Sequence, residues 1–373
     1  MIYLDSAATS LYRPPAVERA VVLAMRTLAN PSRGGHVPAM QAAETVYACR
    51  EEAAALFHVP DPSRVVFTMN ATHGLNLAFH SLVKPGTKVL ISGFEHNAVT
   101  RPLHAAGADV RTAGRTLFEP AELLSAWEAA LPWAEVAVCT CVSNVFGCIL
   151  PITEIAALCC RHGVKLILDA SQAAGVLPLD FEALQAAFIA MPGHKGLLGP
   201  QGTGILLCGE DGVPLMQGGS GAESRLQTMP ELLPEHLEAG TLNVCGIAGL
   251  LEGIRYVRGR GEASILRHEQ MLLETAVSIL SGSGLLLFDG GARQSGVLSL
   301  ICPWMDCEEL ASRLSERSVC VRAGLHCAPL AHESAGTLES GTLRMSFSPF
   351  LSAQNVEKAC ETLLETVEEA KRN

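Results

Sequence analysis

Residues 165–172 read KLILDASQ and residues 188–195 read FIAMPGHK. Each segment begins with an apolar run of the length of a buried strand and ends in a turn of small or polar residues. The first run ends at Asp169, and the second is followed within a few residues by Lys195. The two segments therefore predict successive buried strands that carry an acidic and a basic side chain at or just past their carboxyl ends.

Further apolar runs of the same kind lie on both sides of these segments and alternate with helix-like patterns. Strands are expected at residues 65–68, 88–92, 136–140 and 204–207, and helices at residues 72–82, 119–131 and 152–162. This alternation is typical of an α/β fold with a mainly parallel sheet that is covered on both faces. Ligands bind such sheets beyond the carboxyl ends of the strands, where Asp169 and Lys195 are expected.

From about residue 253 the pattern changes to that of a smaller α+β domain. Helices are expected at residues 262–280, 307–316 and 353–371, and strands at residues 296–302, 319–323 and 343–348. We expect residues 13–252 to form the large domain, and residues 1–12 together with 253–373 to form the small one.

Composition limits the classes of function. The chain has 373 residues, of which 49% are hydrophobic, and a formal net charge of −11, which argues against nucleic acid as a partner. The N-terminal segment does not read as a signal peptide, and no run is long and apolar enough to span a membrane. The 13 cysteines include no Cys-x-x-Cys pair, so we expect reduced thiols, no metal site and a cytoplasmic protein.

Asp169 and Lys195 suit a site for pyridoxal 5′-phosphate (PLP). A lysine amine forms a Schiff base with PLP, and a carboxylate keeps its pyridinium nitrogen protonated so that the ring withdraws electrons. A lone lysine in a glycine turn is more often an ordinary surface residue, but the DASQ segment and Cys327 favour the cofactor site. Thr72, at a strand-to-helix turn, suits phosphate binding and equally suits a helix cap.

Seven motifs between residue 3 and about residue 350 occur in the order found in one enzyme family. They are YLDSAAT at 3–9, EHNA at 95–98, VSNVFG at 142–147, DASQ at 169–172, GHK at 193–195, EAGTLN at 238–243 and VRAGLHC at 321–327. With them the chain resembles the class V aminotransferases among the fold-type I PLP enzymes, and within that family the cysteine desulfurase and selenocysteine lyase branch. The resemblance implies a large domain with a mainly parallel seven-stranded sheet and a smaller α+β domain that carries the catalytic cysteine loop.

The resemblance assigns the cofactor contacts residue by residue. Lys195 would be the Schiff-base lysine, Asp169 the partner of the pyridinium nitrogen, and Gln172 the partner of the phenolic oxygen. His96 would stack on the ring and move protons, since imidazole titrates near neutral pH; a histidine that only closes a strand end is the alternative. The remaining contacts would come from Asn144, from Thr72 and His194 at the phosphate, and from Thr241 of the neighbouring subunit, which implies a homodimer with shared sites.

Two positions depart from the family pattern. Pro192 stands where the family commonly has a serine, and proline offers neither a hydroxyl nor an amide hydrogen. One phosphate contact is therefore missing, and the other phosphate ligands must carry more. His73 stands where the family often has an acidic residue after the phosphate threonine. Neither change affects Lys195, Asp169 or Cys327.

Cys327 is implied to be the nucleophile that takes sulfur from the substrate and holds it as a persulfide. Its segment, rich in Gly, Ser and Pro, runs to Arg344 and predicts a mobile, polar loop. A buried structural cysteine is the alternative. Arg344 would grip the substrate α-carboxylate with help from Asn144, and Arg322 is a weaker candidate for that role.

Two further features come from the resemblance. Arg33 and His36 match a family segment that lines the site, with no role assigned. The interval from Cys327 to Arg344 is short, as in enzymes with a restricted cysteine loop, which need a sulfur acceptor protein or a reductant for turnover.

The function implied is conversion of L-cysteine to L-alanine by a PLP-dependent cysteine desulfurase. A selenocysteine lyase would use the same site with L-selenocysteine. Other PLP reactions on amino acids, such as transamination, racemisation or C–S elimination, remain open. The non-enzymatic alternative is a degenerate scaffold that binds PLP or a partner, against which the intact Lys195, Asp169 and Cys327 argue.

Overall fold

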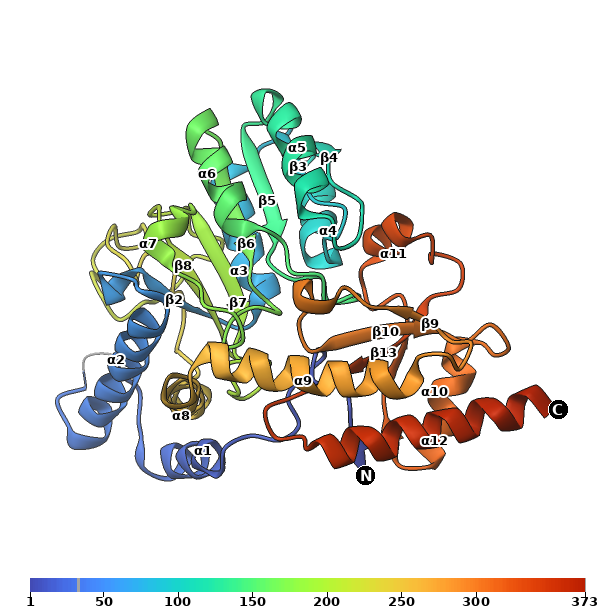
Figure 1. Ribbon diagram of the computed structural model, residues 1–373. Coiled ribbons are helices and arrows are strands. Elements are labelled where there is room, and N and C mark those ends of the chain that lie inside the picture. The colour runs from blue at the N-terminus through green and yellow to red at the C-terminus, as the bar shows by residue number, and fades with distance from the viewer. Residues whose placement is uncertain (32–33, 373) are drawn as a thin grey trace.

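The computed structural model describes residues 1–31 and 34–372, and its largest element is a seven-stranded sheet (Figure 1). The strand order is β2-β8-β7-β6-β5-β3-β4, and β8 alone runs antiparallel to its neighbours. The bounds are β2 Val65–Thr68, β3 Lys88–Ile91, β4 Asp109–Thr112, β5 Val136–Thr140, β6 Lys165–Asp169, β7 Phe188–Pro192 and β8 Gly204–Cys208. The predicted mainly parallel sheet is therefore confirmed.

Both faces of this sheet are buried, which explains the continuous apolar runs. Side chains alternate across a strand, and in β6 Leu166 and Leu168 join one hydrophobic cluster while Ile167 joins another. The first cluster also takes side chains from α2 (Val37–Phe57), α5 (Pro120–Ala130), α6 (Ile152–His162) and α8 (Val244–Arg260), and the second from α3 (Ala71–Leu82) and α4 (Asn97–Ala105).

A second, antiparallel sheet has the order β12-β13-β10-β9 and packs with helices of the C-terminal part. Its strands are β9 Leu286–Phe288, β10 Val297–Ile301, β12 Arg322–Gly324 and β13 Thr342–Ser346. The helices α9 (Glu262–Leu280), α10 (Cys307–Glu316) and α12 (Ala353–Arg372) supply the apolar side chains that cover it. This arrangement confirms the expected change to an α+β pattern.

The predicted single strand at residues 319–323 is wrong, because the chain leaves one sheet and enters another there. Residues Val319–Cys320 form β11, which pairs in parallel with β1 (Ile2–Tyr3), while β12 pairs with β13. The N-terminal strand is thus fixed to the C-terminal part of the chain, and Leu4 is fully buried in its core.

The division between residues 252 and 253 stays a prediction. That point falls inside α8, which runs on to Arg260, and Ile254 and Val257 still pack in the cluster of the large sheet. The remaining helices are α1 (Pro15–Thr27), α7 (Phe181–Leu184) and α11 (Pro329–Ala335). In the described part of the chain, no helix has both the length and the apolarity that a transmembrane segment requires.

Candidate active site

Asp169 and Lys195 meet at one edge of the large sheet. Asp169 ends β6, and β7 runs beside it in parallel with Asp169 opposite Ala190, so Lys195 follows just beyond the same edge. Both residues line a cavity of about 100 Å³. The side chains around it include most of the predicted site residues, namely Thr72, His96, Asn144, Asp169, Gln172, His194 and Lys195, with Pro192 beside them.

The turn before Lys195 leaves no space for a side chain at Gly193. A Cβ placed there would lie 2.1 Å from Thr203 Oγ1, so glycine is required at this close approach. Burial lowers the pKa of Lys195 to about 8, and the nearby cations Arg344 and Arg322 act in the same direction, against Asp169. A lysine with this lowered pKa has more of the neutral amine that nucleophilic chemistry needs.

Asp169 is nearly fully buried, and its Oδ1 accepts a hydrogen bond of 2.9 Å from the Ser171 amide. Glu95 is fully buried nearby, and its Oε1 accepts from the Ser92 hydroxyl and from the Thr140 amide. Thr140 is the β5 residue opposite Asp169. Burial raises the pKa of Glu95 to about 8, and the nearby Asp169 adds to the shift, so at neutral pH Glu95 keeps its proton.

His96 caps the N-terminus of α4. The Ala98 amide donates to His96 Nδ1 at 2.9 Å, so the neutral ring carries its proton on Nε2. Burial lowers the pKa of His96, with an opposing contribution from Asp169. A neutral imidazole that lines the cavity can donate from Nε2 to a ligand there.

The N-terminus of α3 forms one end of the cavity. Asn70 caps this helix by accepting from the His73 amide, and Thr72 lies exposed in the first turn. Helix N-termini present unpaired amides and a positive dipole end, which suits a phosphate group. His194 is also part of the lining, and burial lowers its pKa to about 4, so it contacts a ligand as a neutral ring.

Four of the predicted catalytic and binding residues do not line this cavity, and Cys327, described below, is one of them. Thr241 is exposed and lines a separate pocket with Met69 and His73. Arg344, on β13, is buried, and its Nη1 donates to the Asn144 carbonyl oxygen at 2.8 Å. Arg322 is 52% exposed and lies 3.7 Å from Asp5.

Arg33 lies outside the described residues. His36 precedes α2 as its N-cap, is exposed, and is not among the residues that line the cavity. The structure therefore does not bring His36 to Lys195 within this chain.

Cys327 lies on a tight turn whose backbone is strained. His326 and Cys327 have φ values of 50° and 56°, in the left-handed region that non-glycine residues seldom adopt. The Asn144 side-chain amide donates to the His326 carbonyl oxygen at 2.8 Å, and the Asn97 amide donates to the Cys327 carbonyl oxygen at 2.8 Å. The turn is thus fastened to two segments beside the cavity, and the Cys327 side chain is exposed.

The predicted mobile loop after Cys327 is wrong for this segment. Residues Pro329–Ala335 form α11, with Ala331 fully buried and the Ser334 hydroxyl bonded to the Gly93 carbonyl oxygen at 2.8 Å. Figure 1 shows α11 beside α4. Pro329 at the first helical position and the apolar Leu330 and Ala331 were the sequence signals for a helix here.

Sequence reasoning missed the roles of Asp5 and Glu95. Asp5 accepts from Arg344 Nη2 at 2.9 Å, a contact between residues 339 positions apart. Asp5 lies in the YLDSAAT segment, but no local sequence pattern reveals a partner so distant in the chain.

The sequence of the chain matches the model of the class V aminotransferases over residues 2–359. The chain belongs to this family. It is 30% identical to a probable cysteine desulfurase of Methanothermobacter thermautotrophicus, over 98% of this chain and 94% of that protein, and 31% identical to a cysteine desulfurase of Klebsiella pneumoniae, over 88% and 84%. A cysteine desulfurase structure from Thermococcus onnurineus superposes with a TM-score of 0.90 at 29% identity, covering 99% of this chain and 95% of that one.

Class V aminotransferases are PLP-dependent, and the donor set of the cavity fits that cofactor. Asp169 offers a carboxylate for the pyridinium nitrogen, Lys195 an amine for the aldehyde, and the α3 terminus amides for the phosphate. Within the described residues, the buried Asn144 Oδ1 has no hydrogen-bond partner, and it faces a cavity in which a polar ligand could supply one. The residues present therefore fit PLP, even with Pro192 in place of serine.

Proposed function

We propose that the protein is a PLP-dependent cysteine desulfurase that converts L-cysteine to L-alanine and holds the sulfur on Cys327 as a persulfide. The observation that carries this proposal is the exposed Cys327 on a turn bonded to Asn97 and Asn144. Asn97 directly follows His96 in the sequence, and Asn144 lines the cavity that also contains Lys195. Relatives that carry the name cysteine desulfurase support the same reaction.

Each step of the reaction is assigned to residues of this chain. Lys195 would hold PLP, Asp169 and Gln172 would fix its ring, and Thr72 and His194 would bind its phosphate. When bound, PLP withdraws electrons from the substrate Cα and so makes its proton acidic. The neutral Lys195 amine would take that proton and later return one, and His96 would donate from Nε2 at the ring, a role supported by the Ala98 bond to Nδ1.

Binding of the substrate carboxylate falls to Arg344 and Asn144. Arg344 Nη1 is bonded to the backbone carbonyl oxygen of Asn144, and Asn144 also lines the Lys195 cavity, which supports a shared role for the two residues. The Cys327 thiolate attacks the substrate sulfur; the new S–S bond forms as the C–S bond breaks, and its electron pair remains with the carbon fragment that becomes alanine. Sulfur leaves Cys327 on a reductant or an acceptor protein.

The proposal includes a homodimer in which Thr241 serves the phosphate of the neighbouring subunit. Thr241 is exposed and lies outside the Lys195 cavity of its own chain, which supports a contact across subunits.

The experiment that tests the function is a comparison of substrates. The PLP-loaded protein is incubated with L-cysteine and with L-selenocysteine in the presence of a reductant, and L-alanine is quantified. A desulfurase releases alanine from cysteine. Alanine from selenocysteine alone would identify a selenocysteine lyase, and pyruvate or a racemised substrate would identify another PLP reaction. A PLP absorbance band without any product would support the non-enzymatic scaffold.

A further inference from the structure

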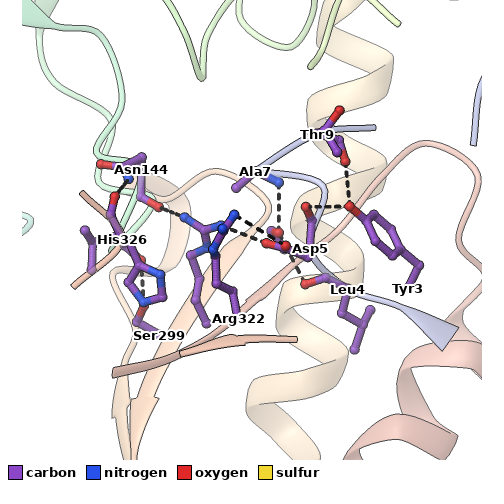
Figure 2. Close-up of polar contacts among 12 residues, drawn as sticks. Tyr3, Leu4, Asp5, Ala7, Thr9, Asn144, Ser299, Arg322 and His326 are labelled. Atoms are coloured by element: carbon purple, nitrogen blue, oxygen red, sulfur yellow. Dashed lines mark hydrogen bonds and ion pairs between the residues drawn. The ribbon is translucent and has the colours of Figure 1, made fainter. Parts of the chain in front are cut away.

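Asp5 bridges the two arginines that the sequence connects with the substrate carboxylate. Its Oδ1 accepts from Arg344 Nη2 at 2.9 Å, and its Oδ2 lies 3.7 Å from Arg322 Nη1. Figure 2 shows the Asp5 side chain on one side of Arg322, and Asn144 and His326 on the other. A carboxylate of the protein itself therefore occupies Nη2 of Arg344.

The two arginines differ in burial. The Arg344 side chain is 2% exposed, and the Arg322 side chain is 52% exposed. A buried guanidinium needs a charged partner, because an unpaired charge in the interior is strongly destabilising. Arg344 Nε is buried without a partner in the described chain, so the guanidinium keeps an unused donor beside the one that Asp5 occupies.

The backbone around Asp5 is fixed. Leu4 donates to the Cys320 carbonyl oxygen at 2.8 Å and accepts from the Ser346 amide at 2.8 Å. The Ala7 amide donates to the Ser346 hydroxyl at 2.9 Å. The carboxylate of Asp5 can therefore change partners by a rotation of its side chain, with no movement of the strand that carries it.

We propose that Asp5 is a positioning residue that pairs with Arg344 before substrate binds and exchanges to Arg322 when the substrate carboxylate takes its place. The inference rests on the proposed role of Arg344 in carboxylate binding. Arg344 Nη1 stays bonded to Asn144 during the exchange, so the guanidinium keeps its orientation. Arg322 receives Asp5 and does not itself contact the substrate.

The exchange sets the affinity for the substrate, because the incoming carboxylate must displace a resident one. Exposed Arg322 lowers the cost of the displacement, since the released Asp5 keeps a cationic partner. Removal of the Asp5 charge should strengthen carboxylate binding, and removal of Arg322 should weaken it only while Asp5 is present.

The test measures binding of 3-mercaptopropionate, which has the thiol and carboxylate of cysteine but no amine to react with the cofactor. Calorimetry on the PLP-loaded protein with reductant gives Kd for the wild type, Asp5→Asn, Arg322→Gln and the double variant. The asparagine retains an oxygen that can accept from Arg344 Nη2. We expect Asp5→Asn to lower Kd at least threefold, Arg322→Gln to raise it at least threefold, and Arg322→Gln to have no effect in the Asp5→Asn background.

Other outcomes overturn the inference. A raised or unchanged Kd in Asp5→Asn would make Asp5 a structural partner only, and an equal rise from Arg322→Gln in both backgrounds would place Arg322 on the ligand. If Asp5→Asn does not fold, an unchanged Kd in the exposed Arg322→Gln variant contradicts the exchange by itself. Arg344→Gln distinguishes a failure of the proposed function from a failure of the Asp5 exchange. If this variant leaves Kd unchanged, Arg344 does not bind the carboxylate, and that part of the proposed function is wrong. Arg313→Gln, an exposed arginine paired with Glu309, is the matched control.

Discussion

The Asn97 amide donates a 2.8 Å hydrogen bond to the carbonyl oxygen of Cys327. Asn97 is the first residue of α4, directly after His96, so the cysteine turn is attached to the helix whose N-cap lines the cofactor cavity. The Asn144 side-chain amide donates to the His326 carbonyl oxygen at 2.8 Å. Two segments that are far from Cys327 in sequence thus hold its backbone beside the site, while its thiol stays exposed.

Lys195 should be the residue that carries the cofactor. Borohydride treatment of the yellow, PLP-loaded protein should fix PLP on the peptide that contains Lys195, because this lysine lines the cavity and has a lowered pKa. Lys195→Ala should lose turnover and retain only PLP that dialysis removes. Mass spectrometry that finds the reduced adduct on Lys165, which is exposed, would contradict the assignment.

Arg344 should carry most of the affinity for the substrate carboxylate. Arg344→Gln should weaken binding of cysteine by about 2–4 kcal/mol, the range for loss of a charge-assisted partner. The PLP content should stay that of the wild type, because Arg344 does not line the cavity. Steady-state kinetics with Arg313→Gln as control test this point, and an unchanged KM and kcat would move the carboxylate role to another residue.

The assignment of Thr241 to the neighbouring subunit can be tested by complementation. Lys195→Ala and Thr241→Glu should each abolish turnover, the second because its carboxylate repels the phosphate. Co-expression should yield mixed dimers in which one site has both a wild-type lysine and a wild-type threonine, and these should recover up to about half of the activity per dimer. If Thr241 serves its own chain, both sites of the mixed dimer stay defective and no activity returns.

Glu95 should make the stability of the protein depend on pH. Burial raises its pKa in the folded state to about 8, above the ordinary value near 4.5 that applies when the chain is unfolded. The buried proton therefore stabilises the fold fully below about pH 4.5, and this contribution is lost as the pH rises towards 8. At pH 7 this stabilisation of the fold is smaller than below pH 4.5 by on the order of 3 kcal/mol, since one pKa unit corresponds to about 1.36 kcal/mol.

The matched variant for this prediction is Glu95→Gln, which keeps an oxygen for the Thr140 amide but cannot ionise. Urea unfolding at pH 5 and at pH 8 should show that the variant loses less stability than the wild type between the two values. Parallel losses in both proteins would mean that Glu95 titrates normally or that other groups set the trend.

The sequence predicted the elements that a buried apolar run or a helical period reveals. Helices Ile152–His162, Glu262–Leu280 and Cys307–Glu316 have the predicted bounds. Strand β4 was missed because Asp109–Thr112 lies at the edge of the sheet, is largely exposed and has no apolar run. The break between β11 and β12 was missed because the choice between two sheets depends on pairing with distant strands.

In the candidate site, too, local sequence patterns predicted some features, and contacts between distant parts of the chain could not be predicted. Asp169 and Lys195 could be predicted because each closes or follows a strand with a clear pattern, and parallel strands bring their carboxyl ends to one edge. The pairing of Asp5 with Arg344 could not, because it joins the two ends of the chain through tertiary structure. The hydrogen bonds from Asn97 and Asn144 to the Cys327 turn depend on a left-handed backbone conformation. The residue types at positions 326 and 327 do not predict that conformation.

Cys327 should accept the sulfur of the substrate, and mass spectrometry of its peptide after a single turnover with L-cysteine detects that sulfur directly. Cys160 is the other exposed free cysteine in the described chain, so Cys160→Ser is the matched control for Cys327→Ser. We expect one added sulfur atom on Cys327 in the wild type and in Cys160→Ser. We expect neither persulfide nor appreciable alanine in Cys327→Ser, which should keep its PLP absorbance. Alanine release from cysteine at the wild-type rate by Cys327→Ser would contradict this role of Cys327.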